Sequence, residues 1–315
     1  MNRINKIKES RGRTIFQIVN ALFLTLMMAV CLYPLLYVVF ASLSKPEQFI
    51  AFQGLLLKPI GGLSLLSYQR ALSHPLILSG YCNTLFIMIV GVCLSVFLTC
   101  IGAYFLSRKN VLWQKPISFL IIFTMFFSGG LIPFYFAVKN FTLYLPWLSN
   151  GALTLKPFSI YNTLWSVILP SAINTYNLIV LRTGFAAIPD SLEESAKIDG
   201  AGNLTILFRI VLPLAKASLA VIILYYGVER WNAWFYASIF INDNTLHPLQ
   251  LVLRQILIIN SDTSTMAGVG AGDQLAVSET IKYAVIVIAT LPILCIYPFL
   301  QKYFVKGVMI GAVKG

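Results

Sequence analysis

Long apolar runs dominate this sequence and limit its fold more than any other feature. A helix needs about 20 consecutive apolar residues to cross a bilayer, where no water satisfies unpaired backbone groups. Hydropathy over a window of about 19 residues finds six such runs, at residues 16–43, 83–106, 117–138, 162–186, 217–240 and 281–304. Only 11% of the 315 residues are charged, whereas soluble domains carry about 25%. The sequence therefore predicts an all-α integral membrane protein with six transmembrane helices.

The first apolar run follows a basic start, MNRINKIKESRGR, and could be mistaken for a signal peptide. It is about twice as long as the apolar part of a signal peptide, and no A-x-A cleavage site follows it. We therefore expect an uncleaved first span. The predicted organisation is an N-terminal segment at residues 1–15, a transmembrane domain at 16–305 and a C-terminal tail at 306–315.

The distribution of lysine and arginine predicts the orientation of the spans. With the N-terminus inside, 15 of the 23 basic residues fall in inner segments and 6 in outer ones. This bias predicts that both termini are cytoplasmic and accounts for most of the net charge of +12. No basic stripe with interleaved aromatic residues points to nucleic acid. The outer loops would be 44–82, 139–161 and 241–280, the last with a flexible segment rich in Gly, Ser and Thr.

Catalytic and metal-binding patterns are absent from the sequence. The five cysteines lie in or beside apolar runs, where we expect buried free thiols, and the two histidines lie in loops before proline. No nucleophile–base cluster suggests an enzyme. No G-x-x-x-x-G-K-[ST] motif occurs, so any ATP and Mg would be bound by another subunit. We expect this chain to bind no cofactor itself.

One polar segment, residues 189–215, separates the fourth and fifth runs. Asp190 with Glu193 resembles a capping box that starts a helix, and Glu193 and Lys197 form a favourable i,i+4 pair. Gly200 is placed for a left-handed C-cap, and Asn203 could cap a second helix. The pattern predicts a short helix, a glycine turn and a second helix leading into the fifth span. Taken alone, it also fits a helix resting on lipid headgroups.

The segment resembles the EAA motif of ABC importer permeases, E-A-A, three residues, G, nine residues, I-x-L-P. The matching residues are Glu194, Ser195, Ala196, Gly200, Ile210, Leu212 and Pro213. Ser195 and Ala217 depart from the commonest form. In that family the helix is the coupling helix, which docks on the ATPase subunit. The resemblance implies an ATPase-coupling role for Glu193, Glu194, Ser195, Ala196, Asp199, Gly200, Ala201, Phe208 and Pro213.

Other segments resemble the carbohydrate-uptake type of these permeases. QKYFVKGVMIGAVKG resembles the C-terminus of that type, which implies an ATPase contact by Gly311, Lys314 and Gly315. FSGGLIPFY and residues 279–304 are similar to the lipoprotein- or polygalacturonan-type branch, and ERWNAWF resembles the W-N element in the fifth span of sugar permeases. The resemblance implies a bacterial plasma-membrane importer that moves oligosaccharides by alternating access. Its partners would be an ATPase dimer, a second and different permease chain, an extracellular solute-binding protein and membrane lipid.

Two other functions fit the residues less well. An ABC permease for a non-sugar solute would share the EAA spacing but usually lacks IDGA together with the GAVKG end. A secondary transporter would show inverted repeats and coupling-ion sites near the midplane. No internal repeat is visible, and Glu229 is the one candidate for such a site.

Residues of the fifth run are candidates for the substrate path. Ionisable groups at membrane depth usually face a cavity or each other, and aromatic faces and amides suit sugars. The candidates are Tyr225, Glu229, Arg230, Trp231 and Asn232. The aromatic residues could instead form a belt at the membrane interface.

Overall fold

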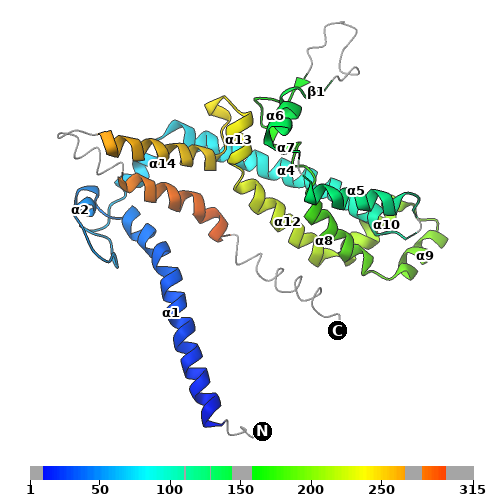
Figure 1. Ribbon diagram of the computed structural model, residues 1–315, viewed down its shortest axis with the longest axis horizontal. Coiled ribbons are helices and arrows are strands. Elements are labelled where there is room, and N and C mark those ends of the chain that lie inside the picture. The colour runs from blue at the N-terminus through cyan, green and yellow to red at the C-terminus, as the bar shows by residue number, and fades with distance from the viewer. Residues whose placement is uncertain (1–9, 110, 128, 144–157, 267–278, 296–315) are drawn as a thin grey trace. The chain divides into compact units, whose positions relative to one another are not determined.

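Helices make up most of the described part of the protein (Figure 1). The computed structural model describes residues 10–109, 111–127, 129–143, 158–266 and 279–295. The helices are α1 (Arg11–Ser42), α2 (Pro46–Ile50), α3 (Leu66–Leu72), α4 (Pro75–Ser107), α5 (Gln114–Phe126), α6 (Leu131–Lys139), α7 (Trp165–Ile168), α8 (Thr175–Ala186), α9 (Asp190–Ile198), α10 (Asn203–Ile206), η2 (Leu207–Val211), α11 (Leu212–Leu214), α12 (Lys216–Trp231), α13 (Phe235–Phe240), η3 (Asn244–Leu246) and α14 (Leu249–Met266). Residues 279–295 are also helical. Strands β1 (Thr142–Leu143) and β2 (Phe158–Ser159) pair antiparallel.

The chain divides into two compact units. The first comprises Met1–Ser73 and Leu257–Ile288, and the second comprises His74–Ile256 and Ala289–Gly315. In the first unit, α1 is exposed along almost its whole length, and its buried residues are Ala41 and Ser42. A 32-residue helix that exposes apolar side chains all round suits contact with lipid or with other membrane helices.

An aromatic cluster forms the core of the first unit. The rings of Tyr37, Phe49 and Tyr283 meet edge to face, with centroids 5.5–6.4 Å apart. Nearby, Ser67 Oγ donates a buried 2.9 Å hydrogen bond to Thr280 Oγ1. These contacts join segments that are more than 200 residues apart in the sequence.

Two helices, α1 and α4, are long and apolar enough to cross a membrane by themselves within the described residues. The number rises to four if two bent pairs each count as one span. In the first pair, α5 and α6 meet at 115°, where Gly130 has a φ of +85° that favours glycine. In the second, Asn203–Leu214 and Lys216–Trp231 meet at 88°. Residues 296–304 of the expected sixth span lie outside the described residues.

The expectation of one continuous helix over 162–186 is wrong. The run is split into α7 and α8, with non-helical residues between Ile168 and Thr175. Pro170 lacks an N–H to extend the first helix. Asn174 starts the second, because its Oδ1 accepts from the backbone N of Tyr176 at 3.0 Å and of Asn177 at 3.3 Å. Proline and an N-capping asparagine therefore break the run although its composition is apolar.

Two smaller expectations are also corrected. The 241–280 loop contains helix α14, which includes residues 260–266 of the segment expected to be flexible; residues 267–278 lie outside the described part. All five cysteines are free, but only Cys100 is buried. The other four lie on helix faces that the isolated chain leaves uncovered. The expectation of burial fails for them because an apolar sequence alone does not distinguish a protein core from a lipid-facing surface.

A stripe of mostly small side chains along α4 forms the spine of the second unit. The stripe comprises Gly80, Thr84, Ile87, Gly91, Ser95, Thr99, Ala103 and Leu106, all buried. Their spacing of three or four residues places them on one helix face, and small residues let neighbouring helices approach closely. Helices α8 and α12 pack against α4, and Figure 1 shows the three lying along one another.

The α8–α12 contact should be sensitive to a single methyl group at Gly184. A Cβ added there would overlap Ser218 Oγ and lie 2.8 Å from Ser218 Cβ. We expect Gly184→Ala to destabilise the protein by about 1–3 kcal/mol, seen as a lower melting temperature in detergent. Gly227→Ala is the matched control, because a Cβ there meets nothing within 4 Å. Equal melting temperatures for the two variants would contradict this packing.

Candidate functional site

Helix α9 and the helical segment after it form the first polar region of the second unit. Residues 189–215 are called the α9–α11 segment below. As predicted, a short helix ends before Gly200, whose φ of +82° is left-handed, and a second helical stretch begins at Asn203. The second stretch contains a π-helical turn, η2, just before Pro213. The predicted helix–turn–helix is therefore confirmed.

The expected caps of this segment are wrong. Asp190 and Asn203 are the first residues of their helices, and neither residue before them makes a side-chain cap. Glu193 does not pair with Lys197 but with a residue from another helix. Asp190 and Glu193 instead pair with basic residues at the end of α4 and just after it.

Glu193 makes a buried ion pair with Arg108, the C-terminal cap residue of α4. Arg108 Nη1 lies 2.6 Å from Glu193 Oε2, and their side chains are 12% and 6% exposed. Arg108 also lies over the ring of Tyr104, 4.9 Å from its centroid, and its Nη2 donates to Phe185 O at 3.4 Å. One guanidinium thus ties α9 to both α4 and α8.

A second ion pair at this junction is exposed. Lys109 Nζ lies 2.7 Å from Asp190 Oδ2. This hydrogen bond and the positive charge lower the pKa of Asp190, and the same hydrogen bond and the carboxylate raise the pKa of Lys109. Exposed pairs add little stability, so the buried Arg108–Glu193 pair is the main electrostatic tether.

The structure separates the nine ATPase-coupling candidates into inward-facing and outward-facing residues. Glu193 and Ala196 are buried, and Ala196 packs in a core cluster with Ala103, Leu106 and Phe185. Glu194, Ser195, Asp199, Gly200, Phe208 and Pro213 are exposed, and Ala201 is half-buried. The exposed apolar side chains beside them are Leu192, Ile198, Leu204 and Phe208, of which Ile198 is 87% exposed. The segment therefore presents an apolar surface edged by polar groups.

Arg230 lies at the second polar region, where α7 and α8 are separated. Its side chain is buried and donates to backbone carbonyls at the break: Val167 O at 2.8 Å, Ile168 O at 3.3 Å and Ser171 O at 2.7 Å. It also donates to Ser171 Oγ and Ser95 Oγ. Within the described residues, no carboxylate forms an ion pair with Arg230.

Tyr226, one turn before Arg230 on α12, holds the other side of the break. Its hydroxyl accepts from the backbone N of Asn174 at 3.0 Å and shares a 2.7 Å hydrogen bond with Thr99 Oγ1. Two side chains of α12 therefore satisfy backbone groups at both edges of the interruption, because residues four apart share a helix face.

A small cavity of about 190 Å³ opens beside this break. It is called the polar pocket below. Its lining includes Ser166 from α7, Ser171 and Asn174 from the break, Glu229 from α12, and the rings of Phe134 and Tyr236. Phe134 and Tyr236 also line a neighbouring cavity of about 600 Å³ between α6 and α13.

The five substrate-path candidates do not share one cavity. Glu229 lines the polar pocket, Arg230 is buried behind it, and Trp231 lines a separate apolar groove. Tyr225 lies beside Tyr176, with ring centroids 6.0 Å apart. Asn232 Nδ2 donates back to Val228 O at 2.9 Å and remains exposed.

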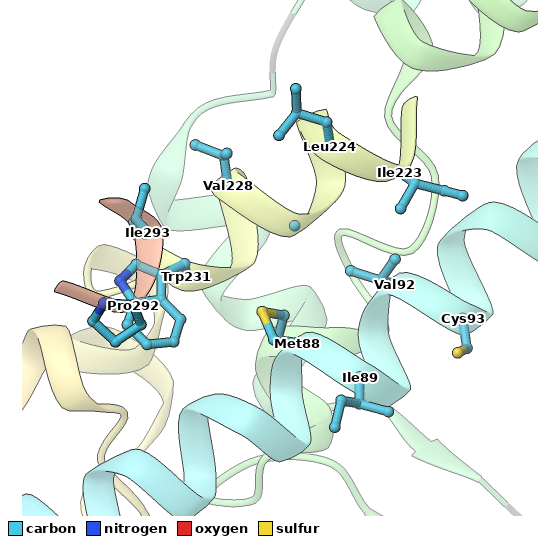
Figure 2. A pocket seen from close by; sticks show the side chains of 11 residues that line it. Met88, Ile89, Val92, Cys93, Ile223, Leu224, Val228, Trp231, Pro292 and Ile293 are labelled. Carbon is cyan, nitrogen blue, oxygen red and sulfur yellow. The ribbon is translucent and has the colours of Figure 1, made fainter. Parts of the chain in front are cut away.

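The apolar groove is lined by residues of α4, α12 and the helix at 279–295 (Figure 2). Met88, Ile89 and Val92 line it from α4 and Ile223, Leu224 and Val228 from α12, and Trp231, Pro292 and Ile293 lie close together at one end. The groove measures about 390 Å³. It offers almost no polar atom, so it suits hydrocarbon rather than a polar ligand.

The important contacts missed from the sequence are those of Arg108, Tyr226 and Ser171. In the sequence, Arg108 is one of several basic residues in the inner segments and Tyr226 is one of several aromatic residues in the fifth run. The proline and asparagine in LPSAIN were a local signal for the helix break. The C-terminal candidates Gly311, Lys314 and Gly315 lie outside the described residues.

The apolar helices, the broken spans and the polar helix–turn–helix define a helical membrane permease. No family model matches the chain. It is 39% identical over 294 residues to the polygalacturonan/rhamnogalacturonan transport system permease protein YtcP of Bacillus subtilis (strain 168), covering 93% of this chain and 96% of that protein. It is 38% identical to Protein LplC of the same organism over 315 residues, all of both chains.

A solved structure gives the same assignment. The crystal structure of a bacterial ABC transporter involved in the import of the acidic polysaccharide alginate matches with a TM-score of 0.81 and 29% identity, covering 95% of this chain and 100% of that one. The chain belongs to the carbohydrate ABC transporter permease subunits. It is a membrane protein and a subunit of a transporter.

Two adjacent glutamates provide a test of the tether between α9 and α4. We expect Glu193→Gln to leave the Arg108 charge unpaired and to destabilise the protein by about 3–5 kcal/mol. Glu194→Gln should have no effect on folding, because Glu194 is exposed. Melting in detergent and the rate of tryptic cleavage after Lys197 measure the difference. The tether is contradicted if both variants behave like wild type.

Proposed function

We propose that this permease moves oligosaccharides from an extracellular solute-binding protein into the cytoplasm by alternating access. The observation that carries the proposal is the near full-length similarity to a permease named for polygalacturonan and rhamnogalacturonan transport. A maltodextrin transport permease of the same organism, 30% identical over 97% of this chain, supports the same substrate class. The transporter would contain a second, different permease chain and an ATPase dimer that binds ATP and Mg.

The α9–α11 segment is proposed as the coupling helix that docks on the ATPase. Its exposed apolar side chains, such as Ile198 and Phe208, would fill a cleft on that subunit, with Glu194 and Asp199 at the rim. Glu193 and Ala196 face the chain's own core and would transmit motion rather than dock. Because Arg108 binds Glu193 directly, a displacement of α9 would pull on the end of α4.

The proposed topology has six spans. The spans at 162–186 and 217–240 are each interrupted, between α7 and α8 and between α12 and α13, and the span at 117–138 is bent between α5 and α6. The first residues of α4 lie by the 242–248 loop, where Asn83 Nδ2 donates to Thr245 O and His247 O. The last residues of α4 lie by α9. If α4 crosses the bilayer once, these two regions lie on opposite sides. The basic inner segments would then favour a cytoplasmic location for α9 and both termini.

Pull-down of the ATPase tests the docking surface. We expect Glu194→Arg, and separately Ile198→Glu, to reduce the ATPase copurified with the permease at least tenfold, because each puts an unmatched charge at the contact. Both sites are exposed in the isolated chain, so the permease itself should fold. Glu47→Arg on α2 is the control with the same charge change. Full ATPase recovery with the two segment variants would reject this docking surface.

Labelling of single cysteines tests the topology. In a cysteine-free background, Ser195→Cys and Thr245→Cys each place a thiol at an exposed position. A membrane-impermeant maleimide added to intact cells should label Thr245→Cys and not Ser195→Cys, while permeabilised cells should show both. Labelling of both, or the reverse pattern, in intact cells would contradict the proposed orientation.

A further inference from the structure

We propose that the polar pocket beside the α7–α8 break is a subsite for one sugar ring, with the Glu229 carboxylate accepting hydrogen bonds from its hydroxyls. This inference rests on the proposed function, because it names a place where the carbohydrate would bind on this chain. Five observations within the second unit support it, and none depends on the other unit.

The backbone is interrupted here within an apolar run, residues 162–186, that is proposed to span the membrane. Non-helical backbone at membrane depth is tolerated where it is buried in protein or lines a cavity. Residues Leu169–Asn174 meet both conditions. Arg230 and Tyr226 of α12 bind backbone groups at the two edges of the break. The polar pocket opens at Pro170, Ser171 and Asn174. Interrupted helices of this kind line the substrate sites of many transporters.

The pocket contains free hydrogen-bonding groups of both kinds. Asn174 uses its Oδ1 to cap α8. Within the described residues, the Nδ2 of Asn174 and the carboxylate of Glu229 make no hydrogen bond. A donor and an acceptor that are both free match a hydroxyl-bearing ligand, since each hydroxyl donates one hydrogen bond and accepts others.

Two aromatic rings complete the lining. Phe134 and Tyr236 meet edge to face with centroids 5.4 Å apart, and they line both the polar pocket and the 600 Å³ cavity next to it. Small-molecule sites measure roughly 300–1,000 Å³. The smaller cavity is therefore the size of a subsite, and the larger one, which shares the Phe134 and Tyr236 rings as lining, has room for further rings of the same ligand.

Charge limits which part of the ligand enters the pocket. Glu229 is exposed to the pocket, whereas Arg230 is buried behind the break with its guanidinium bonded to carbonyl and hydroxyl oxygens. A carboxylate of an acidic sugar would meet Glu229 first and be repelled. The subsite should therefore receive a hydroxyl face, with any carboxylate of the same ligand pointing away from it.

Arg230 acts here as a positioning residue and does not touch the ligand. Gly91 of α4 lets it reach the break, because a Cβ at Gly91 would lie 3.1 Å from Arg230 Nε. The side chain then fixes Ser171 through both its carbonyl and its hydroxyl oxygen. The pocket wall formed by Ser171 depends on that contact.

Uptake by the complete importer in proteoliposomes tests the subsite, with trigalacturonate, its trimethyl ester and maltotriose as probes. We expect Glu229→Gln to raise the half-saturation concentration of each imported probe about tenfold, the effect of weakening a charged hydrogen bond. The acid and its ester should be affected alike. The control is Glu47→Gln, an exposed glutamate on α2, and copurified ATPase and melting temperature should match wild type in both variants.

The outcomes separate this inference from the function on which it rests. If wild type imports a probe and Glu229→Gln has the same half-saturation concentration, the subsite is wrong and the proposed function stands. If Glu229→Gln improves uptake of the acid alone, the carboxylate of the sugar and not its hydroxyls faces Glu229, and the inference is overturned. If the assembled wild-type importer takes up none of the probes, both proposals fail.

Discussion

The absence of water inside a bilayer requires every backbone N–H and C=O group there to find a partner in the protein. The interruption between α7 and α8 frees several such groups, and Arg230 and Tyr226 satisfy them. A buried guanidinium is itself costly unless its donors are bonded. The carbonyls of the break and the terminal nitrogens of Arg230 thus satisfy each other, and the polar pocket opens beside them.

The stripe of small residues on α4 makes this arrangement sterically possible. Gly91 leaves room for the Arg230 side chain, and Ser95 and Thr99 supply hydroxyls to Arg230 and Tyr226. The same helix ends at Arg108, which holds Glu193 of α9. Helix α4 therefore contacts both Arg230, which binds the carbonyls at the break, and the segment proposed to dock on the ATPase.

The α9–α11 segment contains residues of two physical kinds, buried and exposed. Glu193 and Ala196 are buried against α4 and the core, whereas Glu194 and Ile198 are exposed. Spacing along a helix shows that Glu193 and Glu194 point about 100° apart, but it does not show which of them faces the protein. Arg108 decides that question, and it lies 85 residues away in the sequence from Glu193.

Sequence alone determined the features that depend on local chemistry: an apolar helical membrane chain, the helix–turn–helix around Gly200, and the family, through a motif of fixed spacing. It could not determine that 162–186 is two helices, although Pro170 and Asn174 signalled a break, because hydropathy averages over the window in which the break lies. Nor could it place Glu229 in a pocket and Trp231 in an apolar groove. Those assignments depend on which helices pack against α12, and only the tertiary structure fixes them, because packing is decided by contacts between residues far apart in the chain.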